Sequence, residues 1–327
     1  MPVASPAQRA RFLDTGDDAV LPIIDPHHHF FDLGRNHHPW LSDHILTNFR
    51  YGDYTAIRRD FMPADYRRVA AGHLVVGSVL MEGEWDPRDP VGEMRWTTEV
   101  AAGHGAPDAA IGQIWLDRED AASVAAAYRD MPIVRSVRHK PAAVSREAHQ
   151  AGFNAPGSMR DPKWREGYAK LAPAGLHFDL QTPWWHLDEA AELARDFPDT
   201  TIILNHSGLP SDRSAEALAA WQGALERLAK QPNVVAKISG IGVPGREWTL
   251  ELQAPVIAGM ISAFGVERCA FASNFPVDGL CADFGTIFSV FKAATKDRPP
   301  AERLALFHDN AARWYGLASA AAAGARG

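Results

Sequence analysis

Eight short runs rich in Val, Ile and Leu alternate along the chain with longer stretches that mix polar and apolar residues. Short β-branched runs predict strands, and the longer mixed stretches predict amphipathic helices. The predicted strands are residues 20–25, 74–81, 109–115, 133–137, 176–180, 201–204, 234–238 and 269–272. The predicted helices are residues 63–71, 90–103, 118–129, 162–172, 188–197, 215–230, 250–264, 283–296 and 300–315.

This strict alternation predicts the α/β class with a parallel sheet. Eight strand–helix units in 327 residues fit a single-domain (β/α)8 TIM barrel with a long loop after its first strand. A doubly wound open sheet is the rival, but Asp25-Pro26-His27 stands where that fold carries a Gly-rich phosphate turn. We expect an N-terminal extension at 1–19, the barrel at 20–317 and a frayed Ala-rich tail at 318–327.

Polar residues end nearly every predicted strand. In a barrel of this kind the carboxyl ends of the strands meet at one mouth, where the active site lies. Each residue alone could cap a helix or satisfy a loop, but so many together favour a functional site. The set is His27, His29, Glu82, Trp115, Arg138, His139, Gln181, His206, Ser239 and Asn274.

The first strand runs into Asp25-Pro26-His27-His28-His29. Alternate strand residues share a face, so His27 and His29 are predicted to lie together with Asp25 while His28 points away. Two neutral imidazoles so placed can bind a divalent metal or hydrogen-bond a polar substrate. A surface histidine cluster is the alternative, and the matching polar strand ends weigh against it.

Composition narrows the function classes. The net charge of −7 argues against nucleic acid and anionic membranes as partners, and no run is long and apolar enough to span a bilayer. Two cysteines and a polar N-terminus suit a reducing, cytoplasmic location. We expect a small-molecule partner, and the sequence leaves open whether the protein forms a homo-oligomer.

Other residues near the predicted mouth suggest a substrate pocket. Arg138 and His139 supply donors for a carboxylate or a carbonyl, with Gln181 on the next strand. Trp184 and Trp185 follow strand five and are better pocket candidates than Trp40, which we expect to pack the long loop onto the barrel. Lys237, inside strand seven, needs a buried partner, for which Glu82 and Asp179 are the candidates.

Taken together, the motifs resemble the amidohydrolase superfamily, specifically its amidohydrolase 2 branch of TIM-barrel metal-dependent hydrolases. That branch includes sugar-acid lactonases and 2-pyrone-4,6-dicarboxylate lactonase. The resemblance covers residues 20–316. Its motifs are Asp25-x-His27-x-His29, Pro39-Trp40-Leu41, Glu82, Ser136-Val137-Arg138-His139, His206, Pro232-Asn233-Val234, Lys237-Ile238-Ser239-Gly240, Phe271-Ala272-Ser273-Asn274-Phe275-Pro276 and Asn310-Ala311-Ala312-Arg313.

The resemblance implies roles for individual residues. His27 and His29 match a pair that holds a metal in many members and contacts substrate in some metal-free lactonases. His206 matches a histidine near the scissile carbonyl. Where the family has a strand-eight Asp that takes a proton, this chain has Asn274, and a carboxamide cannot act as that base. Asp278, Glu82, Asp25 or a histidine would have to accept the proton instead.

The sequence therefore predicts a hydrolase that opens a cyclic ester, a lactone of a sugar acid or of an aromatic-degradation intermediate. The expected catalytic residues are His206, Asn274, Asp278 and Glu82. His27, His29 and His206 are expected to bind one Zn²⁺, or else the site works without metal. There are two alternatives. One is a non-hydrolytic lyase or isomerase of the same superfamily, and the other is a ligand-binding barrel that has lost catalysis.

Overall fold

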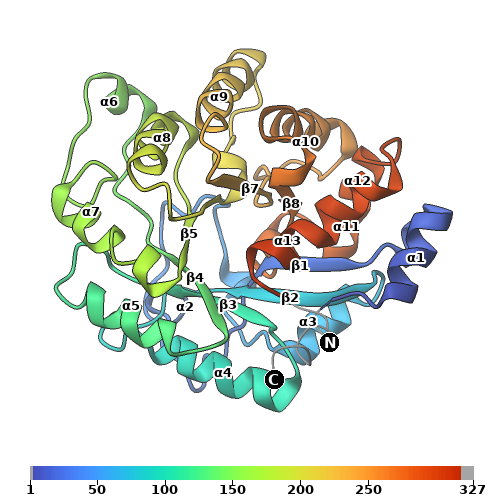
Figure 1. Cartoon of the computed structure of the whole chain (residues 1–327), viewed down its shortest axis with the longest axis horizontal. Coiled ribbons are helices and arrows are strands. Elements are labelled where there is room, and N and C mark those ends of the chain that lie inside the picture. Colours follow the sequence, from blue (N-terminus) through green and yellow to red (C-terminus); the bar gives the residue numbers. More distant parts are fainter. Residues whose placement is uncertain (1–2, 318–327) are drawn as a thin grey trace.

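The computed structural model of the protein describes residues 3–317, and the Ala-rich tail predicted at 318–327 lies outside them. Eight parallel strands form one sheet whose neighbours follow chain order from β1 to β8. Helices surround the strands (Figure 1). The strands are β1 (Ile23–His28), β2 (Val75–Met81), β3 (Ala109–Gln113), β4 (Val134–Arg138), β5 (His177–Leu180), β6 (Ile202–Leu204), β7 (Val234–Ile238) and β8 (Cys269–Phe271).

The sheet closes where the segment after β8 meets β1. His28 and Phe275 form a parallel bridge, and the His29 amide donates to the Phe275 carbonyl at 2.8 Å. The Asn274 amide donates to the His27 carbonyl, also at 2.8 Å. The predicted (β/α)8 barrel is confirmed, and its closure brings the end of strand eight against the histidines of strand one.

The predicted helices are present with small shifts at their ends, but the last one is divided by a π-helical turn, Ala305–Asp309. Part of the N-terminal extension is also helical, and it buries Phe12 against the barrel's last helices. The helices are α1 (Pro6–Thr15), α2 (Pro39–Ser42), α3 (Pro63–Ala70), α4 (Gly92–His104), α5 (Ala121–Arg129), α6 (Arg146–Gln150), α7 (Pro162–Tyr168), α8 (Leu187–Asp196), α9 (Ala215–Leu228), α10 (Leu250–Phe264), α11 (Phe284–Ala294), α12 (Pro300–Leu304) and α13 (Asn310–Trp314).

Strand β1 departs from simple alternation. Its pairing with β2 shifts register between Asp25 and His28, where Pro26 has no amide hydrogen to give to the ladder. The Asp25 carboxylate therefore turns outward and accepts a hydrogen bond from Tyr66 of α3 at 2.8 Å. The prediction that Asp25 shares a face with His27 is wrong, because the irregularity at Pro26 breaks the period of two.

Two apolar layers hold the barrel together. One lies inside it and includes Ile24, Ile111 and Ile203, and the other lies between the sheet and the helices. The interior also holds an ion pair, since Lys237 Nζ lies 2.6 Å from Asp179 Oδ1 and neither side chain is exposed. Lys237 was expected to have a buried partner, and of the two candidates, Glu82 and Asp179, the structure shows Asp179.

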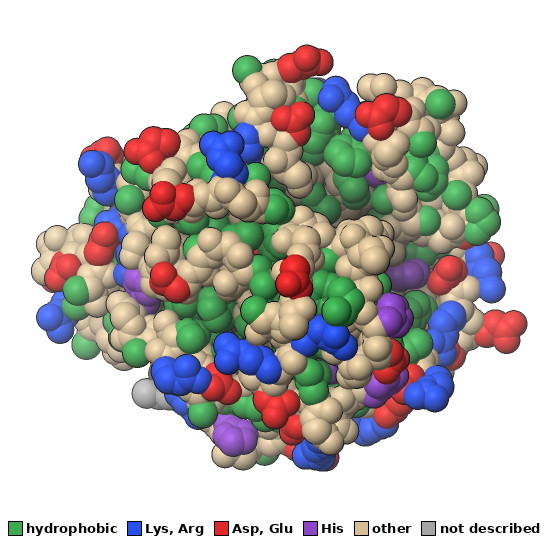
Figure 2. Space-filling view, turned by 180° about the vertical axis from the view of Figure 1, so that it is seen from behind, with side chains coloured by type: hydrophobic (Ala, Val, Ile, Leu, Met, Phe, Trp, Pro, Cys, Tyr) green, Lys and Arg blue, Asp and Glu red, His purple; other side chains and the backbone are tan. Residues whose placement is uncertain are grey.

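On the face of the molecule drawn in Figure 2, charged side chains of both signs are present. Figure 2 shows one face on which acidic and basic side chains are interspersed rather than separated by sign.

Within residues 3–317, none of the helices has the length and apolar character that crossing a membrane would require. Both cysteines, Cys269 and Cys281, are free thiols.

Candidate active site

A cavity of about 150 Å³ opens where the strands end. The ends of five strands, β1, β4, β5, β6 and β8, each supply a polar side chain to it, and the long β1–α3 loop supplies apolar rings. Five of the predicted site residues thus meet in one cavity. Its lining includes His29, Arg138, Gln181, His206 and Asn274 from the strand ends, and Trp40, Phe49 and Arg50 from the loop.

Three imidazoles lie together at this mouth. The ring centroid of His27 is 5.4 Å from that of His29 and 4.5 Å from that of His206. His29 Nδ1 lies 3.0 Å from the Met81 carbonyl, which can only accept, so this nitrogen carries the ring proton and Nε2 is bare. Both ring nitrogens of His27 are buried and have no hydrogen-bond partner within residues 3–317.

All three imidazoles are held in the neutral form. Burial lowers the pKa of His27, His29 and His206 well below the ordinary value for histidine. The positive charge of Arg138 lowers each of the three pKa values further, and that of Arg50 acts on His206. Neutral rings with bare nitrogens can bind a metal or accept a proton.

The backbone around His206 is unusual. His206 and Ser207 both have left-handed φ values, 55° and 54°, which non-glycine residues seldom adopt. His206 Nδ1 lies 3.1 Å from the Ser239 hydroxyl at the end of β7. Gly240 comes next, and a Cβ there would stand 2.5 Å from Cγ of His206. Only a glycine therefore lets the ring lie this close to the end of β7.

Glu82 and Arg138 form a buried ion pair in which both side chains are at most 4% exposed. Nε of Arg138 donates to a carboxylate oxygen of Glu82, and Nη2 donates to the Glu82 carbonyl at 3.0 Å. Nη1 of Arg138 donates to Gln181 at 3.1 Å. The other carboxylate oxygen of Glu82 accepts the Glu84 amide at 2.6 Å. Glu82 is thus fully engaged, and its geometry fits a role in orienting Arg138.

Asn274 is oriented by the carboxylate four residues further on. Its Nδ2 donates to Asp278 Oδ1 at 2.7 Å, and the Tyr51 hydroxyl donates to the same oxygen at 2.7 Å. This contact leaves the amide oxygen of Asn274 for the cavity that the residue lines. Asp278 is fully buried, and burial raises its pKa to about 6, even though Arg50, Tyr51 and Asn274 lower it.

Three predicted substrate-binding residues do not line the cavity. His139 follows Arg138 and faces the other way, since its Nδ1 accepts from the Trp164 indole at 2.9 Å and the Leu116 amide at 3.1 Å. Trp184 stacks under the Arg146 guanidinium, with 4.9 Å between Cζ of Arg146 and the ring centroid. Trp185 donates to the Val144 carbonyl at 2.9 Å.

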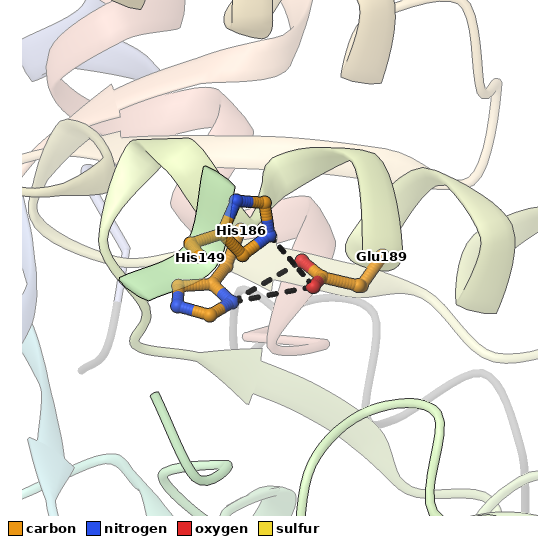
Figure 3. Close-up of side chains that lie close together, drawn as sticks. All are labelled: His149, His186 and Glu189. Atoms are coloured by element: carbon orange, nitrogen blue, oxygen red, sulfur yellow. Dashed lines mark hydrogen bonds and ion pairs between the residues drawn. The ribbon is translucent and has the colours of Figure 1, made fainter. Parts of the chain in front are cut away.

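A second histidine group lies on α6, η4 (Trp184–His186) and α8, and it was not predicted. His149 Nε2 and His186 Nδ1 lie 2.9 and 3.3 Å from carboxylate oxygens of Glu189 (Figure 3). Among residues 3–317, this is the one group of three candidate metal ligands whose atoms all lie within 4.8 Å of one another.

The hydrogen bonds of this second group disfavour a metal. His186 Nε2 accepts the Val144 amide at 3.2 Å, so the ring proton is on Nδ1 and points at Glu189. Arg160 also lies 3.7 Å from Glu189. Burial alone would raise the pKa of Glu189, but hydrogen bonds from His186 and His149 outweigh it and lower the pKa. The group fastens the α6 segment to α8.

Sequence reasoning missed cavity residues that come from loops. Arg50 lies on the β1–α3 loop, and Lys140 pairs with Glu84 across the rim. Trp40, which we expected to pack the loop, does so by donating to the Gly83 carbonyl at 2.8 Å, yet it also lines the cavity. The sequence signal for a cavity residue was its place just after a predicted strand. Of these three residues, only Lys140 has such a place.

The fold and the polar strand ends define a (β/α)8 barrel with a histidine-rich active-site mouth. The sequence model of the amidohydrolase family matches residues 24–317, and the chain belongs to this family, in its amidohydrolase 2 branch.

Individual relatives span nearly the whole chain. An uncharacterized protein, y4mH, of Sinorhizobium fredii is 40% identical over 90% of this chain and 98% of its own. An L-fucono-1,5-lactonase of Burkholderia multivorans is 26% identical over 90% of this chain and 96% of its own. The crystal structure of an amidohydrolase from Burkholderia multivorans with bound HEPES has a TM-score of 0.73 and is 25% identical, covering 90% of this chain and 99% of that one.

Proposed function

We propose that the protein hydrolyses a small cyclic ester, a lactone. The observation that carries this proposal is a cavity lined by the neutral imidazoles of His29 and His206 and by a guanidinium that a buried carboxylate fixes. A cavity of about 150 Å³ matches one known to take a single six-membered ring. The similarity to an L-fucono-1,5-lactonase, at 26% identity, supports the same class of substrate.

Each step of ring opening has a residue of this chain to perform it. Water attacks the ester carbonyl carbon while His206 takes a proton from that water. Free N–H groups of Arg138 hold the oxyanion that forms, and the Glu82 ion pair keeps the guanidinium in place. The tetrahedral intermediate then expels the ring oxygen, which takes the proton back from His206. The product is a hydroxy acid.

We assign the proton to His206 because the carboxylates nearby are otherwise engaged. Glu82 is bound to Arg138 and to the Glu84 amide, and Asp25 faces α3. Asp278 is fully buried behind Asn274. The Asn274 amide oxygen, left free by the bond to Asp278, is suited to accept a hydrogen bond from a hydroxyl group of the substrate.

The donor set at β1 also fits a divalent metal, because His27 has two buried nitrogens without partners and His29 has a bare Nε2. His27 and His29 would hold such an ion. A bound Zn²⁺ would polarise the ester carbonyl and acidify the attacking water.

A panel of sugar-acid and aromatic-pathway lactones, assayed for proton release with and without chelator, tests the proposal. We expect ring opening of at least one five- or six-membered lactone, and a chelator-sensitive rate would support the metal at His27 and His29. Inactivity on every lactone, together with loss of CO₂ from an aromatic acid, would replace the proposal with a decarboxylase.

A further inference from the structure

Arg50 stands at the cavity with a positive charge that no carboxylate of residues 3–317 contacts directly. Its Nη2 donates to the Gly240 carbonyl and, at 2.9 Å, to the Tyr51 hydroxyl. Its guanidinium carbon also lies 4.4 Å from the centroid of the Tyr51 ring. These contacts fix the guanidinium with uncharged partners. Within residues 3–317, no carboxylate oxygen comes within the 4.0 Å of Arg50 that defines an ion pair.

The other cations of the cavity lining are already neutralised. Arg138 is paired with Glu82, and Lys140 is paired with Glu84. Asp278 is the acid linked to Arg50, but the link runs through the Tyr51 hydroxyl rather than by direct contact. In the described part of the chain, Arg50 is thus the cavity cation that has room for an anionic ligand.

A second guanidinium increases the local positive charge. Arg213 donates to the Ile241 carbonyl at 2.5 Å, next to the carbonyl that Arg50 contacts, and its Nε and Nη1 are buried without a partner in residues 3–317. Burial lowers the pKa of Arg213 to about 10, and the charge of Arg50 contributes to this lowering. Two like charges at the end of β7 repel each other, and an anion would relieve that repulsion.

We propose that Arg50, supported by Arg213, forms a carboxylate subsite, so that the ring taken by this cavity carries a carboxylate group. That the ligand is a lactone rests on the proposed function. That it carries a carboxylate rests on the contacts of Arg50. Arg50 and His206 line the same cavity, and Arg50 donates to the carbonyl of Gly240, the residue that packs against the His206 ring. A carboxylate held by Arg50 would therefore lie beside the reacting carbonyl. The guanidinium binds it through Nε and Nη1, which have no partner within residues 3–317, in the bidentate geometry that arginine favours.

Binding can be tested without any ester. Isothermal titration calorimetry compares cyclohexanecarboxylate with cyclohexanecarboxamide, which has the same shape and no charge. We expect the carboxylate to bind at least about 10-fold more tightly, and Arg50→Gln to remove about 10-fold to 100-fold of its affinity. Arg50→Lys keeps the positive charge but loses the bidentate guanidinium, so its affinity for the carboxylate should lie between those of the wild type and Arg50→Gln. Arg59→Gln is the matched control, since Arg59 is exposed on the same loop and does not line this cavity.

Equal binding of the two probes by the wild-type protein would overturn the subsite, whatever the variants do. Unchanged carboxylate affinity in Arg50→Gln would overturn it as well. Kinetics with a ring-carboxylated lactone and its methyl ester then separate the two proposals. We expect Arg50→Gln to raise KM for the acid alone. If the acid probe binds through Arg50 but no lactone opens, the subsite stands and lactone hydrolysis fails.

Discussion

The protein has two histidine groups that differ in how their nitrogens are satisfied. In the second group, His149 and His186 share the Glu189 carboxylate, and His186 also accepts the Val144 amide. At the barrel mouth, His27 has no partner for either nitrogen within residues 3–317. The pKa values of the mouth histidines are depressed by burial and by neighbouring cations, whereas Glu189 supplies the second group with its own counter-charge.

Proximity of candidate ligands is therefore a poor guide to function in this molecule. In the second group the three side chains lie close together because they are hydrogen-bonded to one another. The looser group leaves both buried nitrogens of His27 unpaired, next to two histidines that line the cavity. Unpaired buried nitrogens cost folding free energy that a ligand can recover. The ring nitrogens of His28 are also unpaired, but this ring packs against Phe30 and Tyr66 and not against the histidines of the cavity.

The largest expected effect of a substitution is at His206. Asn in its place keeps a polar side chain but cannot take the proton, so kcat should fall by about 10²-fold to 10⁴-fold. His149→Gln, in the second group, should leave kcat unchanged. Steady-state kinetics on the best lactone checks both variants. Comparable losses of kcat in the two would mean that the groups do not differ in function.

Gly240→Ala should be the next most harmful change. The added Cβ would press on the His206 ring, and the left-handed φ of 58° disfavours alanine. A displacement of this kind can cost about 100-fold in kcat. Gly245→Ala, at another left-handed glycine with open space around it, is the control for backbone strain alone. An equal loss in both variants would show that contact with His206 is not the cause.

The buried carboxylates near the two groups differ in pKa, since that of Asp278 is raised and that of Glu189 is lowered. The pH dependence of stability can test the shift of Asp278. The folded pKa of Asp278 is about 6, above its ordinary 3.8, so the folded state favours the protonated acid. The stability that the folded protein gains by keeping Asp278 protonated is fully present below about pH 4 and is lost as the pH rises through about 6. The free energy of unfolding of Asp278→Asn, relative to wild type, should therefore be larger at pH 8 than at pH 4, by up to about 3 kcal/mol. A difference that is independent of pH would contradict this.

Glu189→Gln should have the smallest effect, confined to stability. The neutral amide weakens the bonds to His149 and His186 and should lower the free energy of unfolding by about 1–2 kcal/mol. Denaturant titration measures this change, and kinetics should show an unaltered kcat. A large loss of activity without a loss of stability would assign the second group to the reaction.

Much of the barrel could be predicted because strands and helices have local signals. Each apolar run became a strand, and the ends of five strands brought predicted polar residues into one cavity. That Lys237 has a buried acidic partner also followed from the cost of burying a lone charge, although the sequence left Glu82 and Asp179 as alternatives. These are consequences of periodicity and burial, which the sequence carries directly.

Side-chain direction could not be predicted where tertiary contacts decide it. Asp25 faces outward because Pro26 disturbs the ladder, and His139 is turned away by the Trp164 indole, 25 residues further along the chain. Arg50 reaches the cavity only because its loop folds back over the barrel mouth. No local pattern distinguishes Arg50 from Arg59, which is exposed on the same loop.

The most direct test of the account is turnover of a lactone in water enriched with heavy oxygen, followed by mass spectrometry of the product. Hydrolysis by attack of water at the carbonyl predicts one heavy oxygen in the new carboxylate, at a rate that falls sharply in His206→Asn. Turnover that incorporates no label, or release of CO₂ in its place, would contradict a hydrolytic site.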